Sequence, residues 1–175
     1  MEDILIDYVT GKPVPNVGPE GSRQLFEKIL VETKGFSKKE IRVDEPITVM
    51  FQNQTYESTL DLVVFCDERP FMAVRCIAGS LGSYEREILA GARLIYDHQI
   101  PFSVATNGKD ALVRNVITGK PHGEGMDTVP TREWAKEQIK EMKKIPFPEG
   151  KKEREMILFR SYNMEKYENE CDGLT

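Results

Sequence analysis

The stretch that decides the fold is Tyr56–Gly79, YESTLDLVVFCDERPFMAVRCIAG. It contains two runs rich in β-branched and aromatic residues, and a polar turn at 67–70 separates them. This pattern predicts two antiparallel strands joined by a hairpin. The centres of both runs, LDLVVF and FMAVRCIA, are apolar at consecutive positions, which is typical of central strands covered on both faces. The stretch therefore predicts an α/β sandwich rather than an exposed sheet.

More strands are predicted on either side of this hairpin. The run IRVDEPITVMF at 41–51 predicts a strand that pairs with it antiparallel. The segment PFSVATNGKDALVRNVITGK at 101–120 predicts two further strands joined at Asn107-Gly108, because both residues tolerate positive φ. Together these runs predict a sheet of about five strands.

Three helices are predicted around the sheet from apolar residues at helical spacing. They cover 19–33, the stretch from Ser83 to Tyr96 with Ser83 available as N-cap, and 131–145. The last of them carries the basic stripe Arg132, Lys136, Lys140 and Lys144. Because glutamates interleave with this stripe, we interpret it as a solvated face with i to i+3 ion pairs rather than as a phosphate track.

The chain divides into three predicted regions. Residues 1–20 form an N-terminal arm, since the prolines and glycines of GKPVPNVGPEG cannot continue a helix or a central strand. Residues 21–145 form the compact domain. Residues 146–175 form a linker, PFPEGKKERE, followed by a weakly ordered tail or a docking segment.

Composition narrows the classes of function. The net charge of −5 argues against a strongly basic nucleic-acid coat but leaves room for a local basic cleft. Three cysteines at irregular spacings fit reduced thiols, and two histidines make a zinc site improbable. The chain has an acidic N-terminus and no long apolar run, so we expect a soluble, cytoplasmic protein without membrane partners. The absence of GxxxxGK[ST] excludes a P-loop motor.

Several blocks resemble a known family in the same order. GSRQLFEKILVETKGFSKKEIRVDEPI, LDLVVFCDERPFMAVRC, SLGSYEREILAGARLIY, PFSVATNG and ITGKPHGEGMD resemble the N-terminal domain of type I restriction enzyme R subunits and its stand-alone relatives. The resemblance covers roughly 21–134. It implies a restriction-endonuclease-like core with a mixed central sheet flanked by helices, and a DNA-cleaving PD-(D/E)xK site. In such a site, carboxylates hold Mg²⁺ and a lysine helps to orient the nucleophile.

This sequence departs from the family's motif at two of three positions. The motif aspartate matches Asp61, but the glutamate position holds Arg75 and the lysine position holds Ile77. Alternation along a strand keeps Arg75 and Ile77 on one face, so a register slip does not restore the motif. A guanidinium cannot ligate Mg²⁺, and we expect it to pair with a carboxylate, Asp61 first of all. Asp61 alone would remain as a metal ligand if the site were active.

Three acids could substitute for the missing groups. Glu27 matches an acidic position that sometimes borders sites of this fold, although a solvated acid on a helix face is the plainer interpretation. Glu85 and Glu87 open the second helix, where negative charge is favourable whatever the function. We expect His122, in a glycine-rich turn, to be a loop residue.

Three hypotheses about function follow. The first is a catalytically degenerate nuclease fold that binds DNA or a protein partner without cutting. The second is an active Mg²⁺-dependent endonuclease with a rearranged site. The third is a structural or homo-oligomerisation module that retains only the fold.

Overall fold

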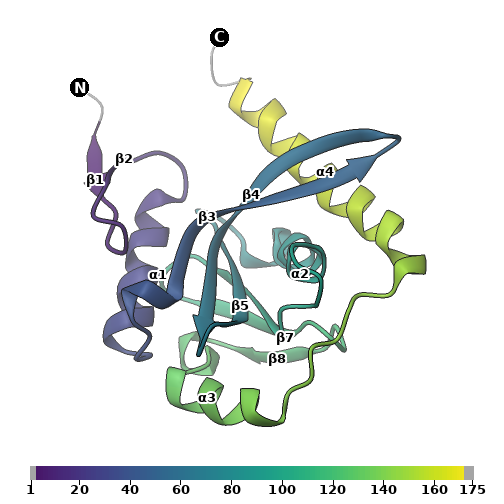
Figure 1. Cartoon of the computed structure of the whole chain (residues 1–175). Coiled ribbons are helices and arrows are strands. Elements are labelled where there is room, and N and C mark those ends of the chain that lie inside the picture. Colours follow the sequence, from purple (N-terminus) through teal and green to yellow (C-terminus); the bar gives the residue numbers. More distant parts are fainter. Residues whose placement is uncertain (1–2, 172–175) are drawn as a thin grey trace.

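The structure is a computed structural model that describes residues 3–171 of the chain, with side chains up to Asn163. Its centre is a six-stranded sheet that is antiparallel except for one parallel pair (Figure 1). The strands lie in the order β3-β4-β5-β6-β7-β8. Their bounds are β3 Ile41–Phe51, β4 Gln54–Cys66, β5 Arg69–Cys76, β6 Phe102–Thr106, β7 Ala111–Asn115 and β8 Pro121–Glu124.

The predicted hairpin in the middle of the sequence is confirmed. β4 and β5 are antiparallel neighbours with Val63 opposite Ala73, and β3 pairs with the other edge of β4. The Asn107-Gly108 turn joins β6 and β7 antiparallel, and Gly108 has the positive φ, +83°, that this turn requires. β5 and β6 are parallel and are joined through the second helix, which makes the sheet mixed.

The mixed sheet has one strand more than the expected number of about five, because β8 adds a sixth at its edge. His122 lies on this strand rather than in a loop. The glycines around His122 suggested a turn, but Gly123 pairs with Val113 and packs so closely that an added Cβ would meet the side chain of Thr128.

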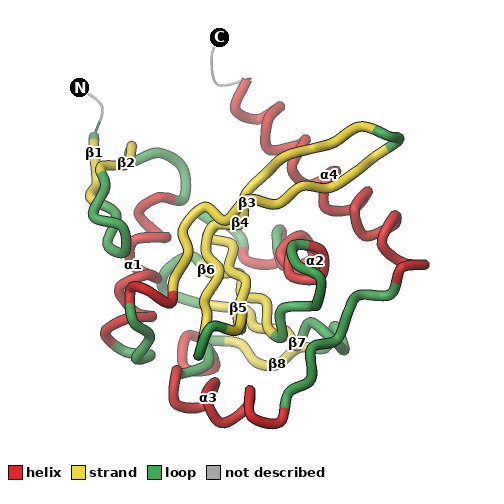
Figure 2. Tube along the Cα trace, viewed as in Figure 1, coloured by secondary structure: helices red, strands yellow, loops and turns green. Residues whose placement is uncertain are grey.

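Two helices cover each face of the sheet, as expected for an α/β sandwich (Figure 2). Phe26 of α1 (Glu20–Glu32) and Ala135 of α3 (Arg132–Glu141) belong to one apolar core. Ile88 of α2 (Glu85–Leu94) and Phe159 of α4 (Glu149–Cys171) belong to the core on the opposite face. Short 3₁₀ turns lie at Lys38–Glu40, Leu81–Ser83 and Met126–Thr128.

α2 packs on the sheet as predicted, although it begins later than expected. Ile88 and Ala92 are fully buried and Ile95 is half-buried. Ser83 is not the N-cap, because it lies in the preceding 3₁₀ turn and Tyr84 takes the cap position without a side-chain hydrogen bond. A Cβ added at Gly91 would lie 2.7 Å from Leu60 Cδ2, so this glycine lets α2 approach β4 closely.

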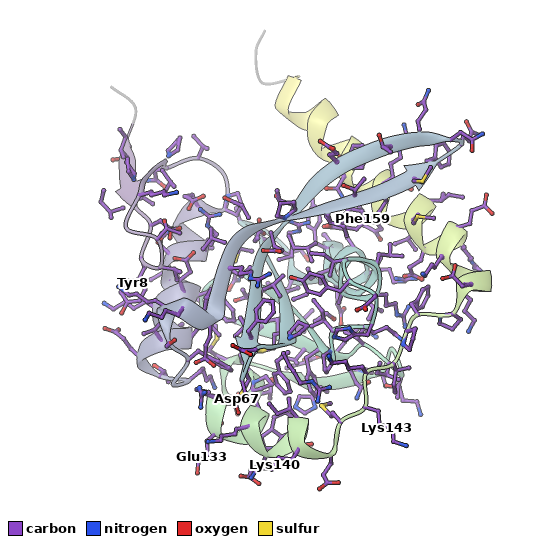
Figure 3. All side chains as sticks on the ribbon, in the orientation of Figure 1. Tyr8, Asp67, Glu133, Lys140, Lys143 and Phe159 are labelled. Carbon is purple, nitrogen blue, oxygen red and sulfur yellow. The ribbon has the colours of Figure 1, made fainter. Side chains whose placement is uncertain are left out.

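The predicted third helix is shorter than 131–145. It ends at Glu141, and Ile145 at the end of the expected apolar stripe is 42% exposed. The expected i to i+3 pairing is present, since Lys140 Nζ lies 3.0 Å from Glu137 Oε1. Figure 3 shows Glu133 and Lys140 projecting from α3 away from the sheet, as on a solvated face.

The prediction of a linker over 146–155 is wrong from Glu149 onward, because α4 begins there. The docking alternative fits better. Phe159, labelled in Figure 3, is fully buried in the core shared with α2, and Ser58 Oγ donates to Asn163 Oδ1 at 2.9 Å. Glu155 binds Arg86 and Arg93, which ties α4 to α2. The prolines and glycine around 146–150 concealed the start of this helix.

The N-terminal arm contains regular structure that was not expected. β1 (Ile4–Ile6) and β2 (Pro13–Pro15) form a separate two-stranded ribbon beside α1 (Figure 1). Among the described residues, no helix is both long enough and apolar enough to cross a membrane.

Candidate functional site

The two motif positions Asp61 and Arg75 lie beside each other on neighbouring strands, as predicted. Asp61 lies in the middle of β4, and Arg75 is the second-last residue of β5, next to Cys76. Arg75 Nη1 lies 3.2 Å from Asp61 Oδ1. The second carboxylate oxygen of Asp61 accepts the Cys76 backbone N–H at 2.7 Å. Both oxygens of Asp61 therefore already have partners.

Arg75 makes its closest contacts with Glu87 rather than with Asp61. Its Nε donates to Glu87 Oε2 at 3.2 Å, and its Nη2 donates to Glu87 Oε1 at 2.5 Å. This side-on fork is the geometry in which a guanidinium binds a carboxylate most specifically. Nη2 also donates to the carbonyl of Thr59 at 3.1 Å. Each of the three nitrogens of Arg75 thus contacts at least one oxygen.

Burial strengthens these ion pairs. The side chains of Arg75 and Glu87 are 5% and 3% exposed, and that of Asp61 is 14% exposed. Burial alone would lower the pKa of Arg75, but Asp61 and then Glu87 raise it above the ordinary value. The guanidinium is therefore held as a cation between two acids. We call Asp61, Arg75 and Glu87 the charged triad.

The charged triad does not fit a divalent cation. A magnesium ion needs several oxygen ligands, whereas Arg75 places its positive charge against both acids. A metal beside Asp61 would have to displace the guanidinium and would then meet its charge. Among the described residues, no group of three or more His, Cys, Asp or Glu side chains is arranged to hold a metal ion.

Ile77 makes the wall beside the triad apolar. It lies directly after β5, is 7% exposed, and donates its backbone N–H to the carbonyl of Thr106. A pocket of about 360 Å³ opens at this point. It is lined by Pro19 and Tyr84, by Arg75 and Cys76 at the end of β5, and by Ile77 and the small residues that follow it. The lining residues include no lysine, and Arg75, which binds Asp61 and Glu87, is the cation among them.

Glu27 is not a solvated acid, contrary to the plainer interpretation of the sequence. It is fully buried in α1 and accepts the Val9 backbone N–H at 3.3 Å, while its Oε1 lies 3.8 Å from Arg23 Nε without a hydrogen bond. Burial, and then the charge of Asp7, raise the pKa of Glu27 to about 8. Glu27 therefore holds a proton at neutral pH more readily than an ordinary carboxyl group.

Arg23 is the centre of this second set of charges. It contacts Asp7, Glu20, Glu27 and Asp44, at 3.3, 2.6, 3.8 and 2.9 Å. Asp7 also accepts the backbone N–H groups of Val9 and Thr10 and the Gln24 amide, so this set binds the N-terminal arm to α1. We call Arg23, Glu27 and Asp7 the arm cluster.

Glu85 lies apart from both groups. Its Oε1 accepts from Arg114 Nε at 2.5 Å, with side chains 20% and 28% exposed. The structure thus brings Asp61, Arg75 and Glu87 together, with Ile77 beside them, and directs Glu85 to β7. Arg132, the first residue of the predicted basic stripe, binds Glu40 and Asp67 rather than a neighbour on α3.

Two functional contacts were missed in the sequence. Glu87 was considered as a substitute ligand and not as the main partner of Arg75. It lies one helical turn before Gly91, which faces the sheet, and this spacing indicates that Glu87 faces the sheet as well. Asp7 was not singled out at all. It contacts residues 16 and 17 positions away, and no local pattern marks such a pairing.

Comparison with known proteins gives one result. A family model described as "Type I restriction enzyme R protein N terminus (HSDR_N)" matches residues 18–130, which include both strands of the charged triad and α2. No curated protein and no solved structure matches the chain.

Proposed function

This chain belongs to the family of type I restriction enzyme R protein N termini, and from that premise we propose that it is a nuclease-fold domain that binds DNA or a protein partner without cutting DNA. The observation that carries the proposal is the buried charged triad. Arg75, a cation of the protein itself, binds the carboxylates of Asp61 and Glu87 at the place where the family's motif would need a metal. The fold is retained and the groups for hydrolysis are not.

The chemistry of phosphodiester hydrolysis supports this proposal. The family resemblance assigns three tasks to the motif: holding Mg²⁺, activating water and orienting the nucleophile. Asp61 is committed to Arg75 and the Cys76 amide, and Ile77 offers no donor. Without a bound metal and a lysine, the site lacks the groups with which the family's motif activates water and stabilises the leaving oxygen.

A plasmid-nicking assay tests the proposal. The unaltered protein should leave supercoiled DNA intact with Mg²⁺ or Mn²⁺, since no metal is positioned to activate water. The double variant Arg75→Glu/Ile77→Lys rebuilds the motif, so it should gain metal-dependent stabilisation and weak nicking. A matched control, Lys136→Glu/Ile157→Lys, makes the same charge changes at exposed positions and should gain neither.

Cleavage by the unaltered protein that is lost in Asp61→Ala would contradict the proposal. It would support a rearranged active site and direct attention to Glu27, Glu85 and Glu87. DNA binding is tested separately by titration at several salt concentrations, because contacts with phosphates make affinity fall steeply with salt. Binding that depends on salt identifies DNA as the ligand, and its absence favours a protein partner.

A further inference from the structure

The two-stranded ribbon of the N-terminal arm has one closed edge and one open edge. Asn16 N donates to Asp3 O and Asp7 N donates to Lys12 O, so Asp3 and Asp7 direct their backbone groups toward β2. In an antiparallel pair, successive residues direct their backbone N–H and C=O groups alternately toward the partner strand and away from it. The backbone groups of Ile4 and Ile6 therefore point outward from β1, and those of Pro13 and Pro15 point outward from β2.

The outer edge of β2 cannot accept another strand. Pro13 and Pro15 have no N–H, and the Pro15 carbonyl already accepts from Val17 N at 3.0 Å. The outer edge of β1, by contrast, has both backbone donors and backbone acceptors available. Within the described residues, no hydrogen bond engages the backbone N–H or C=O of Ile4 or Ile6. β1 thus presents two donors and two acceptors in strand geometry.

One face of the ribbon is apolar and uncovered. The register pairs Ile4 with Pro15 and Ile6 with Pro13, which places these four side chains on the same face. Ile4 and Ile6 are 59% and 64% exposed, and both prolines are exposed as well. Leu5 and Val14, on the opposite face, are half-buried. A two-stranded ribbon of this kind gains stability when further strands extend it.

We propose that the open edge of β1 pairs antiparallel with β1 of a second copy of this chain, about a two-fold axis at Leu5. The free groups lie symmetrically on either side of Leu5, so Ile4 of one copy meets Ile6 of the other. Two residues in such a pair exchange both backbone hydrogen bonds, and the two pairs satisfy all the free groups. The closed edges of β2 then end a four-stranded sheet and prevent further growth.

The second copy fits this edge because the edge is self-complementary in donors and acceptors and because the apolar faces of two ribbons become continuous. Three residues per strand bury much less area than a permanent dimer needs. The dimer is therefore weak and reversible. The charged triad lies on β4, β5 and α2, so this inference does not depend on the proposed function.

Sedimentation equilibrium over micromolar to millimolar concentration tests the inference. The mass of the unaltered protein should rise from 20.0 kDa toward twice that value. Ile6→Pro removes an outward N–H that the monomer does not use, so this variant should fold normally and stay monomeric. The matched control Ile6→Val keeps the amide and an apolar side chain, and it should dimerise like the unaltered protein.

Amide hydrogen exchange gives a second measurement at the same residues. The amides of Ile4 and Ile6 should exchange more slowly as concentration rises, whereas the Leu5 amide, which faces β2, should be unaffected by concentration. An unaltered protein that stays monomeric at the highest concentration would overturn the proposal. Dimerisation of Ile6→Pro to the same extent as the unaltered protein would overturn it equally.

Discussion

The charged triad and the arm cluster both place one buried arginine among carboxylates, yet the two arginines bind their glutamates differently. Arg75 binds Glu87 through Nε and Nη2 at 3.2 and 2.5 Å. Arg23 directs its Nε toward Glu27 at 3.8 Å, and neither that Nε nor Glu27 Oε1 has a hydrogen-bond partner among the described residues. Arg75 thus binds Glu87 in a bidentate fork, whereas Arg23 makes no hydrogen bond to Glu27.

The difference has a physical cause. The two terminal nitrogens of Arg23 contact Asp7, Glu20 and Asp44, which leaves only Nε for Glu27. Burial together with the charge of Asp7 then raises the pKa of Glu27 to about 8. Residue types alone do not determine whether a buried acid is ionised. Burial comes first for Glu27, and the charge of Asp7 and the distance to the Arg23 donor add to it.

The largest expected effect is the loss of Arg75. Arg75→Ala leaves Glu87 buried and Asp61 nearly so, without a cation, and removal of one partner from a buried pair costs about 3–5 kcal/mol. Urea unfolding at pH 6 measures this cost. The matched change Arg23→Ala should cost less, because Glu27 is protonated at that pH, Asp44 can reach water and the buried Asp7 keeps its hydrogen bonds from Thr10 and Gln24. An equal or larger loss for Arg23→Ala would contradict the comparison.

The next effect is a dependence of stability on pH to which Glu27 contributes. The folded state raises the pKa of Glu27 from 4.5 to about 8, so folding binds a proton. The free energy of unfolding should therefore fall as pH rises between these values, by about 1.4 kcal/mol for each unit of pKa shift retained in solution. Stability curves from pH 5 to pH 9 measure the slope.

Glu27→Gln is the matched variant for this experiment because it cannot ionise. Its free energy of unfolding should rise relative to that of the unaltered protein as pH increases over this window, and the difference should level off above about pH 8. A constant difference between the two proteins over the window would show that the fold does not raise the pKa of Glu27.

The smallest effect is expected at Glu85, two residues before Glu87 on the same helix. Its pair with Arg114 is partly exposed, and pairs of this kind contribute about 0–1 kcal/mol. Glu85→Ala should lower the unfolding midpoint in urea only slightly, whereas Glu87→Ala should lower it strongly. Similar losses for the two variants would mean that burial does not set the strength of the triad.

Much of the sheet could be predicted from the sequence, because its signals are local. Consecutive apolar residues identified the central strands, and Asn107-Gly108 identified a hairpin. The ribbon and α4 were missed because prolines were taken as the end of regular structure. In β2 they occupy positions whose N–H would point outward, where a strand tolerates them.

The candidate site was predicted in part for the same reason. The contact between Asp61 and Arg75 follows from two adjacent strands of one hairpin, so the sequence sufficed. The stronger contact with Glu87 depends on how closely α2 approaches the sheet, which Gly91 permits but does not reveal alone. The burial of Glu27 depends on an arm whose contacts are distant in sequence, and helix periodicity placed that residue at an edge.

If Arg75 takes the place of a metal at Asp61, calorimetric titration of the unaltered protein with Mn²⁺ should give no saturable heat. The variant Arg75→Glu/Ile77→Lys should show a saturable site that disappears when Asp61→Ala is added to it. Stoichiometric binding of Mn²⁺ by the unaltered protein, abolished by Asp61→Ala alone, would mean that Arg75 does not keep a metal from Asp61.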